Sequence, residues 1–500
     1  MMDGTQKSDG PIVPTKLPNN AMSTAAEVVE ERGPTKGNTT KQNSLRTQRR
    51  ASGEPSALER VRQRAKQDKM AKFSALFHHV TRERLRSAFL QTKKRAAAGV
   101  DEVTWESYAV ELDKNIAELH DRLQRGAYRA KPSRRVFIPK PDGSQRPLGI
   151  ASLEDKIVQR AVVEVMNAVY EADFLGFSYG FRERRSQHHA LDALATGIVR
   201  KKVNYVLDAD IRGYFDSIDH EWLLRFLEHR IADKRLLRLI QKWLAAGVLE
   251  DGRWSETKQG SPQGATVSPL LANVYLHYVF DLWVQQWRHR KAKGEVIVVR
   301  YADDTVVAFQ NHREATNFLE DLHLRMGRFR LELHPKKTRL ISFGRFAAKR
   351  RQERGLKGAP ETFDFLGLTH ICGRARAGRG FVLVRHTVKR RMLATLKRIR
   401  DELMRRRHLS IPQQGKWLRA AVQGYFAYHA VPTNGRNLAM FRKEVERRWL
   451  FALRRRSQRH RLTWTRMQRI ARRWLPMPKV IHPWPEQRFD ARTQGRSRVR

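Results

Sequence analysis

Two neighbouring carboxylates inside an apolar stretch constrain the fold of this chain more than any other feature. The stretch Val296–Gln310 has the sequence VIVVRYADDTVVAFQ, with Asp303 and Asp304 between two runs of strand-forming residues. This pattern predicts a β-hairpin that turns at the two acids. Like charges this close raise each other's pKa unless a cation lies between them. Alternatively, the acids only cap backbone N–H groups of the turn, a role that Asp often has.

A second pair of acids favours a metal site. Asp208 and Asp210 are two positions apart on a predicted strand, Val203–Ile211, so both side chains point to one face. Unpaired carboxylates in an apolar run cost free energy. Mg²⁺ is usually held by one or two carboxylates, water and substrate phosphates, and the sequence has no His/Cys cluster with zinc spacing. Two strands that carry such acids therefore suggest two-metal phosphoryl transfer.

The charge of the chain indicates its partner more than its fold. The 500 residues include 99 Lys and Arg against 51 Asp and Glu, a formal net charge of +48. Nucleic acid is the natural counterpart, because each neutralised phosphate releases counterions; an anionic membrane surface is the alternative. No apolar run is long enough to span a membrane, and the single cysteine, Cys372, excludes an intramolecular disulfide. We expect a soluble intracellular protein.

The composition and periodicity divide the chain into five predicted parts. Residues 1–55 are expected to form a disordered basic leader, and residues 56–130 a helical extension that includes the helically spaced Phe73, Leu76, Phe77 and Val80. Residues 131–375 combine a predicted hairpin with a Pro-Asp-Gly turn, helices over 155–170 and 219–246, and the acidic strands. Residues 376–475 are predicted to be helical, and the basic tail 476–500 to be poorly ordered.

Three apolar stripes with helical spacing are typical of the core faces of a helix bundle. They are Met392, Leu396, Ile399 and Leu403; Trp417, Ala421, Tyr425 and Tyr428; and Phe441, Val445, Trp449 and Leu453. The arginines between them would face solvent or RNA.

An ordered set of motifs resembles the bacterial group II intron-encoded reverse transcriptase/maturases. RYADD at 300–304 resembles the reverse transcriptase signature. The other matches follow the order of the family: AAGVDEVTWESY (97–108), RRVFIPKPDGSQRPLGI (134–150), EDKIVQRAV (154–162), FSYGFRERRS (177–186), DADIRGYFDSIDH (208–220), GSPQGATVSPLLANVYL (260–276), LELHPKKT (331–338), FDFLGLTH (363–370), GYFAYHAVPTN (424–434) and LRRRSQ (453–458). The resemblance extends from about residue 70 to 490.

The resemblance implies an α+β fold, a right-hand polymerase whose fingers and palm contain antiparallel sheet, followed by a helical thumb/maturase domain. It implies an RNA-directed DNA polymerase that uses two Mg²⁺ ions and dNTPs. The family also binds its own intron RNA, assists splicing and moves the intron by target-primed reverse transcription. The implied partners are intron RNA, the DNA target and a primer, without a membrane, and the implied location is the bacterial cytoplasm, on the nucleoid when DNA is bound.

The resemblance assigns catalytic, metal-binding roles to Asp210, Asp303 and Asp304, with Ile211 as a further metal-binding position. Asp210 is preferred over Asp208 because the family has an aromatic residue five positions after the first catalytic acid, and Phe215 is there. A ring at this position would clash with a ribose 2′-OH and select deoxynucleotides. Phe215 could also be only a core aromatic beside the site.

Five further residues are expected at the nucleotide. Lys140 and Arg146 flank the Pro-Asp-Gly turn and resemble the family's triphosphate-binding pair, a role that suits cations. Gln263 and Gly264 lie in a Ser-Pro-Gln-Gly turn, where a glycine lets the backbone approach the nucleotide. Lys337 resembles a palm lysine. Ordinary surface charges and a strand-to-helix turn are the alternative interpretations.

The sequence departs from the family at its end. Many relatives carry a C-terminal His-Asn-His endonuclease domain with cysteine pairs, which the lone Cys372 cannot form. This departure implies integration at a primer already present, such as a nascent strand at a replication fork. A splicing-only maturase, a reverse transcriptase of defence or diversity generation, and a basic membrane-surface or structural protein are the alternatives. The intact acids argue against a splicing-only maturase, and the GYFAYHAVPTN motif argues against a reverse transcriptase of defence or diversity generation. The motifs as a whole argue against a basic membrane-surface or structural protein.

Overall fold

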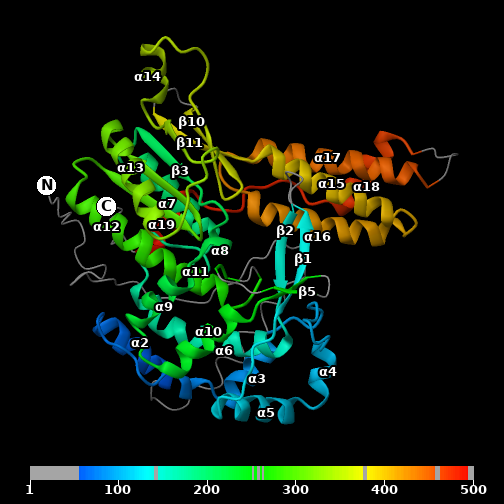
Figure 1. The fold of residues 1–500 in the computed structure, drawn as a ribbon. Coiled ribbons are helices and arrows are strands. Elements are labelled where there is room, and N and C mark those ends of the chain that lie inside the picture. Colours follow the sequence, from blue (N-terminus) through cyan, green and yellow to red (C-terminus); the bar gives the residue numbers. More distant parts are fainter. Residues whose placement is uncertain are drawn as a thin grey trace.

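A computed structural model describes residues 56–139, 145–250, 253–255, 259–261, 264–375, 380–456 and 462–493. It is an α+β structure in which a sheet-bearing body continues into a helical C-terminal region (Figure 1). The predicted leader over 1–55 lies outside the described residues. The first helices are α2 (Ala57–Gln67), α3 (Arg82–Leu90), α4 (Trp105–Val110) and α5 (Leu112–Gln124). Of these, α2 and α3 pack against the long helix α6 (Leu153–Asp173), and α5 packs against α3.

The central sheet has the strand order β6-β7-β3-β8, and all its pairs are antiparallel. Its strands are β3 (Tyr205–Ala209), β6 (Val296–Tyr301), β7 (Asp304–Phe309) and β8 (Arg339–Ser342). The predicted hairpin is confirmed, but its turn lies one residue earlier than expected. Tyr301 pairs with Asp304, so Ala302 and Asp303 form a two-residue loop and Asp304 begins β7. Because Ala209 pairs with Thr305, the end of β3 lies beside this loop.

Both faces of the central sheet are buried, which explains why β6 is apolar from Val296 to Val299. Val296 and Val298 face a core that includes α6, α9 (His220–Glu228), α11 (Ser268–Leu276) and α13 (His312–Arg328). Ile297 and Val299 face a second core, which includes α7 (Gln187–Arg200). A π-helix (His277–Asp281) connects α11 to α12 (Leu282–Arg290).

A second sheet has the order β2-β1-β4-β5. Strands β1 (Ser133–Pro139) and β2 (Gln145–Ile150) form the predicted antiparallel hairpin, and its Pro-Asp-Gly turn lies outside the described residues. β1 also pairs in parallel with β4 (Val248–Glu250), which pairs with β5 (Arg253–Ser255). A third sheet, with β9 (Phe363–Phe365), β10 (Leu368–Arg374) and β11 (Phe381–Thr387), leads into the helical region, and α14 (Ala347–Glu353) precedes it.

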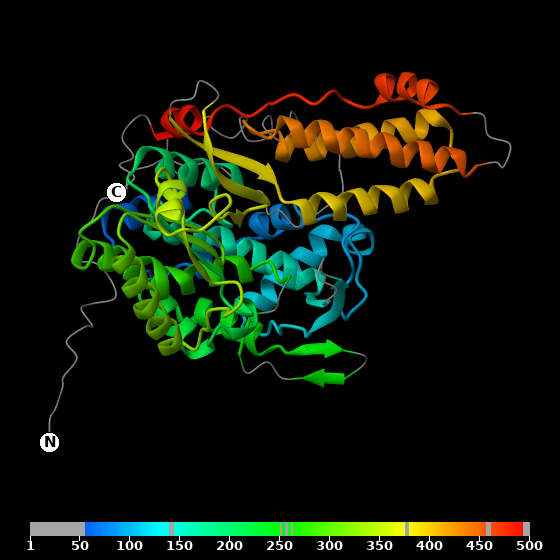
Figure 2. The same ribbon diagram turned by 90° about the horizontal axis from the view of Figure 1, so that it is seen from above.

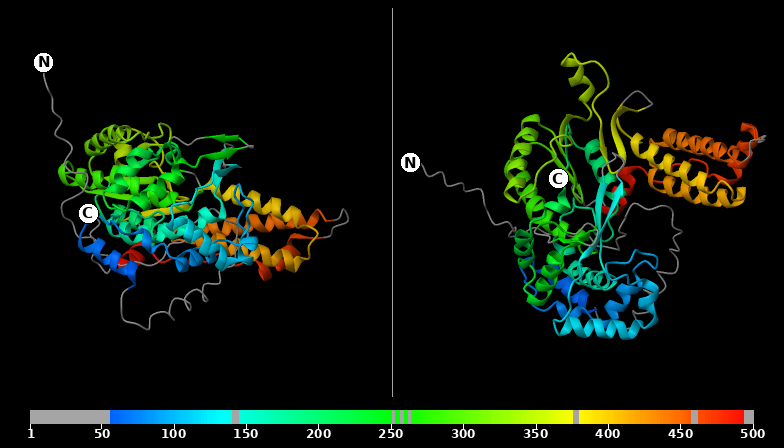
Figure 3. Two further views of the ribbon diagram at one scale, coloured as in Figure 1. Left: turned by 60° about the horizontal axis from the view of Figure 1, so that its bottom comes forward. Right: turned by 45° about the vertical axis from the view of Figure 1, so that its right-hand side comes forward.

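The helical region contains α15 (Lys389–Arg405), α16 (Ile411–His429), α17 (Gly435–Arg454) and α18 (Trp464–Trp474), and it projects from the sheet-bearing body (Figure 3). The first and third predicted stripes are buried as expected. The second stripe is displaced, because α16 buries Gln414, Leu418, Val422 and Phe426 besides Tyr425. The buried Gln414 accepts a hydrogen bond at its Oε1 from the indole N–H of Trp449, at 2.8 Å. No helix of the described ranges is long and apolar enough to cross a membrane.

Two helical predictions are wrong, and Asp233 explains both. Phe73–Val80 contains only a 3₁₀ turn at Phe77–His79, because the Asp233 carboxylate accepts hydrogen bonds from the N–H groups of Leu76 and Phe77 at 2.8 and 2.7 Å. The predicted helix 219–246 is interrupted, since Asp233 also caps a new helix, α10 (Lys234–Ala245). A polar side chain outweighs apolar periodicity in both places.

The expectation that the chain is poorly ordered after Pro476 is wrong for its described part. The chain returns from α18 along the bundle to a helix, α19 (Pro485–Thr493), that lies beside α7 (Figure 2). Arg200 of α7 binds Asp490 through two nitrogens at 2.8 and 2.6 Å. His482 stacks on His188 with ring centroids 4.0 Å apart. The C-terminal segment thus joins the helical region to the central sheet.

Candidate active site

Three aspartates meet at one end of the central sheet. Asp210 directly follows β3, Asp303 lies in the loop of the β6–β7 hairpin, and Asp304 begins β7. Their arrangement follows from the register, because β3 pairs with β7 up to Ala209 opposite Thr305. Sequence analysis therefore selected residues that the fold gathers in one place.

The pKa values of Asp303 and Asp304 are raised, first by desolvation and also by the negative charges of neighbouring acids. Desolvation raises the pKa of Asp304 to about 7, and the negative charges of Asp303, Asp210 and Asp208 contribute to the rise. Desolvation also raises the pKa of Asp303, with a contribution from Asp210. This accumulation of negative charge is what a divalent cation would relieve.

Asp210 has a cation beside it in the structure. The Lys337 ammonium lies 3.1 Å from Asp210 Oδ2, and the Lys337 side chain is 61% exposed. The backbone oxygen of Asp210 accepts a hydrogen bond from the N–H of His334 at 2.8 Å, which fixes the end of β3 against the segment that carries Lys337. An exposed ion pair of this kind contributes little stability. Lys337, expected at the nucleotide, thus contacts the first of the predicted catalytic acids.

The donor set fits Mg²⁺, which prefers carboxylate and carbonyl oxygens. Within the described ranges no group of three or more His, Cys, Asp or Glu side chains is placed to hold a metal ion on its own. Mg²⁺ does not require such a group, because substrate phosphates and water complete its shell. Asp210, Asp303 and Asp304 would supply the carboxylates. The Ile211 side chain is apolar and buried, so only its backbone oxygen could contribute.

Asp208 is the fourth acid of this region. Desolvation raises its pKa to about 7, although the neighbouring Arg339 lowers it. It pairs with Arg339 across β8 and with Val306 across β7, so it lies within the sheet and Asp210 lies beyond its end. This position agrees with the preference for Asp210 as the metal ligand, which stays a prediction.

Phe215 lies on a short helix, α8 (Tyr214–Ser217), that begins after Gly213 in the left-handed conformation. Its ring is half-buried against the core, and its carbonyl accepts a hydrogen bond from the N–H of Ser261 at 2.7 Å. The turn that begins at Gly260 is therefore attached to α8. Both interpretations of Phe215, core aromatic and sugar-selecting ring, are compatible with a half-buried side chain.

Gly264 ends the Ser-Pro-Gln-Gly turn with φ of +108°, and a Cβ at this position would lie 2.7 Å from the backbone oxygen of Gly149 in β2. The glycine is thus needed for contact between the turn and the second sheet, whatever else approaches it. Arg146 on the same strand is exposed, and its charge lowers the pKa of Asp303. Lys140 and Gln263 lie outside the described residues.

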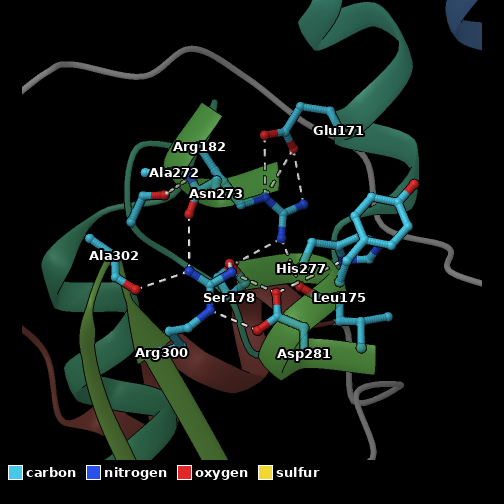
Figure 4. Close-up of polar contacts among 12 residues, drawn as sticks. Glu171, Leu175, Ser178, Arg182, Ala272, Asn273, His277, Asp281, Arg300 and Ala302 are labelled. Carbon is cyan, nitrogen blue, oxygen red and sulfur yellow. Dashed lines mark hydrogen bonds and ion pairs between the residues drawn. The ribbon is translucent and has the colours of Figure 1, made fainter. Parts of the chain in front are cut away.

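Sequence analysis missed the buried polar cluster behind the hairpin, which includes Ser178, Arg182, Asn273, Asp281 and Arg300 (Figure 4). The Arg300 guanidinium binds both oxygens of the Asp281 carboxylate, at 2.7 and 2.5 Å. A signal was present, because Arg300 ends the apolar run VIVVR and Asp281 interrupts the apolar stretch YLHYVFDLWV. Charges inside apolar runs require partners.

The helical region reaches the same end of the sheet. The Tyr428 hydroxyl of α16 donates a hydrogen bond to the backbone oxygen of Leu366 at 2.6 Å. Leu366 and Gly367 both have positive φ, at 46° and 80°, and form the turn between β9 and β10. Arg391 of α15 lies against Gly367, and its charge lowers the pKa of Asp304. Basic helices thus border the acidic site.

Comparisons with known proteins identify the family of this chain. A family model described as "Reverse transcriptase (RNA-dependent DNA polymerase)" matches residues 138–370, which include all three acids. The protein YkfC of Escherichia coli is 33% identical over 281 residues, 50% of this chain and 74% of YkfC. The group II intron-encoded protein LtrA of Lactococcus lactis is 34% identical over 225 residues, 44% of this chain and 37% of LtrA.

A protein encoded in the cob intron of Schizosaccharomyces pombe is 41% identical over 162 residues, 32% of this chain and 20% of that protein. The chain therefore spans well under half of the length of these two intron-encoded relatives. The match to YkfC covers most of that protein. The chain belongs to the reverse transcriptase family, the RNA-dependent DNA polymerases, and is related to group II intron-encoded proteins.

Proposed function

We propose that this reverse transcriptase belongs to a group II intron, binds its intron RNA, assists splicing and copies the intron into DNA by target-primed reverse transcription. The observation that carries the proposal is the continuity of the site with a basic helical region, because Arg391 of that region lies next to the turn that borders Asp304. The relationship to LtrA, named as a group II intron-encoded protein, supports the same proposal.

In the proposed reaction Asp210, Asp303 and Asp304 hold two Mg²⁺ ions, with the backbone of Ile211 as an additional ligand. Bound Mg²⁺ lowers the pKa of the primer 3′-hydroxyl and neutralises the triphosphate. The other contributions come from the chain itself: the paired strands hold the carboxylates at one end of the sheet, where desolvation and the neighbouring acids raise the pKa of Asp304 to about 7.

The nucleotide is proposed to bind between the second sheet and α8. Lys140 and Arg146 contact its phosphates, and Phe215 excludes a ribose 2′-OH. Gln263 and Gly264 contact it from the turn. Lys337 is proposed to leave Asp210 when a divalent cation arrives and to face the nucleotide, since its exposed ion pair is cheap to break.

We propose the same domain boundaries as the sequence predicts, with polymerisation and RNA binding in different parts of the chain. Residues 131–375 form the fingers and palm and 376–475 the thumb and maturase domain, with 56–130 as a helical extension and 476–500 as the C-terminal tail. The helical region would recognise intron RNA by positive charge and shape. Helix α15 (Lys389–Arg405) fits such a role, because it is basic and its buried residues are only Met392, Leu396, Ile399 and Leu403.

The proposed setting is the bacterial cytoplasm, where intron RNA, DNA target, primer and dNTPs are the partners and bound DNA brings the protein to the nucleoid. The proposed primer is a strand already present, such as a nascent strand at a replication fork. Site-specific cleavage of the target strand by the protein alone would contradict this part of the proposal.

A splicing assay tests the double function. The intron RNA that flanks the coding gene is incubated at a Mg²⁺ concentration too low for self-splicing, with wild-type protein, Asp304→Ala or no protein. We expect both proteins to accelerate splicing and only the wild type to make complementary DNA. If the wild type makes complementary DNA but binds this RNA no better than an unrelated RNA of equal length, the intron role is wrong and the polymerase role stands.

A further inference from the structure

The residue that precedes the YADD motif uses every hydrogen-bond donor it has. Arg300 is fully buried, and a guanidinium has five N–H groups. Nε and Nη2 bind the two oxygens of Asp281 at 2.7 and 2.5 Å, and Nη2 also donates to Ser178 Oγ at 2.8 Å. Nη1 donates to Asn273 Oδ1 and to the backbone oxygen of Ala302, both at 3.0 Å. Four of these contacts anchor the guanidinium, and the fifth reaches the hairpin loop (Figure 4).

The anchor itself is part of the surrounding helices. Asp281 is fully buried and ends the π-helix between α11 and α12. π-Helices are rare in proteins, and those that occur are often found at functional sites. Asn273, one turn before the π-helix, also donates to the backbone oxygen of Gly180 at 2.7 Å. Asn273 of α11 thus contacts both Arg300 and Gly180, which lie on either side of the hairpin loop.

The loop that receives the fifth contact is strained. Ala302 is the first of the two loop residues and has φ of 57°, a conformation that glycine adopts readily and alanine rarely. On its other side, a Cβ on Gly180 would lie only 2.2 Å from the Ala302 nitrogen, so the two backbones are in close contact. Strained residues persist where the surroundings over-determine them. Here Arg300 holds the Ala302 oxygen and Gly180 abuts its nitrogen.

We propose that Arg300 is a positioning residue, which fixes the Ala302–Asp303 loop so that Asp303 and Asp304 keep a set distance from Asp210 and can share divalent cations with it. Arg300 touches neither substrate nor metal, and acts through the Ala302 carbonyl. The inference rests on the proposed function, because it assigns the metal site to these acids.

A purely structural role is the competing explanation, since a buried ion pair left half-paired destabilises any fold. Arg182 offers a matched control. It is also buried, binds the Glu171 carboxylate at 2.9 Å and donates to the backbone oxygens of Leu175 and Ser178 at 2.7 and 2.9 Å. Arg182 makes no bond to the hairpin loop, so its replacement perturbs the same region without releasing Ala302.

The experiment compares full-length wild type with Arg300→Lys, Arg182→Lys and Arg300→Lys/Ala302→Gly. Mn²⁺ binding is measured by electron paramagnetic resonance, in parallel with thermal unfolding, template–primer affinity and primer extension on RNA. A lysine keeps the charge beside Asp281 but cannot also reach Asn273 and Ala302. Should Arg300→Lys not fold, the neutral pair Arg300→Gln/Asp281→Asn takes its place.

We expect Arg300→Lys to weaken Mn²⁺ binding about tenfold, as loss of an orienting contact does at metal sites, with template–primer affinity within about twofold of wild type. Arg182→Lys should lower thermal stability and leave Mn²⁺ binding unchanged. Ala302→Gly should restore part of the Mn²⁺ affinity, because glycine needs no clamp to adopt this φ. Unchanged Mn²⁺ binding in folded Arg300→Lys, or equal loss in Arg182→Lys, would overturn the inference. Failure of the wild type to extend a primer would refute the proposed function, and the Mn²⁺ measurements would still decide the role of Arg300.

Discussion

Adding one methyl group at Gly180 should disable the active site without unfolding the protein. The new Cβ of Gly180→Ala would lie 2.2 Å from the Ala302 nitrogen and 2.9 Å from the Tyr301 carbonyl carbon, both backbone atoms of the catalytic hairpin. Ordinary contact begins at 3.4 Å, so the segments must separate by roughly 1.2 Å. A displacement of about 1 Å at reacting groups can lower a rate about 100-fold, while overpacking costs about 1–3 kcal/mol of stability.

Steady-state primer extension on an RNA template measures kcat for this variant, and thermal unfolding measures its stability. Gly176→Ala is the matched control, because it lies in the same segment, is exposed and has no neighbour within 4 Å of a built Cβ. We expect kcat to fall by about two orders of magnitude for Gly180→Ala and to stay near wild type for Gly176→Ala. A folded Gly180→Ala with wild-type kcat would refute the reasoning that this contact sets the position of the acids.

Three further outcomes are expected. Phe215→Val should reduce discrimination against ribonucleotides by about tenfold or more; an unchanged ratio of dNTP to rNTP incorporation would exclude the sugar-selecting role. Since folding raises the pKa of Asp304 from 3.8 to about 7, the stability that this group contributes to the metal-free protein is present below pH 3.8 and is lost as the pH rises through 7. Protons then compete with Mg²⁺, so the Mg²⁺ concentration for half-maximal extension should rise as the pH falls from about 8 to 6; a constant value would contradict the assignment. Binding of RNA should weaken about 1,000-fold between about 50 and 200 mM salt, and a flat salt dependence in a filter-binding assay would mean that phosphate contacts are few.

The hairpin and its acids could be predicted because local rules determine them. Two apolar runs of strand-forming residues around Asp303 and Asp304 leave room only for a short turn, and the structure has a two-residue loop there, Ala302–Asp303. The same is true of the β1–β2 hairpin and of the buried stripe on α17. In each of these places the local pattern and the tertiary contacts favour the same structure.

The failures occur where one polar side chain binds a distant backbone or side chain. Asp233 takes the N–H groups of Leu76 and Phe77, more than 150 positions away in sequence, and no local pattern announces such a contact. On α16, Gln414 is buried and its Oε1 accepts a hydrogen bond from Trp449, whose position depends on the bundle as a whole. The Arg300 cluster was detectable in principle, because a charge within an apolar strand needs a buried partner, but the sequence does not identify that partner as Asp281.

The most direct test of the central claim, that the paired acids hold catalytic metal, is primer extension on an RNA template with Mg²⁺ and dNTPs. Wild type, Asp304→Ala and Asp304→Asn are compared after thermal unfolding and RNA binding show that all three are folded. We expect the wild type to extend the primer and both variants to be inactive, since neither can supply the carboxylate. Extension by Asp304→Ala at the wild-type rate, or none by folded, RNA-binding wild type, would contradict the claim.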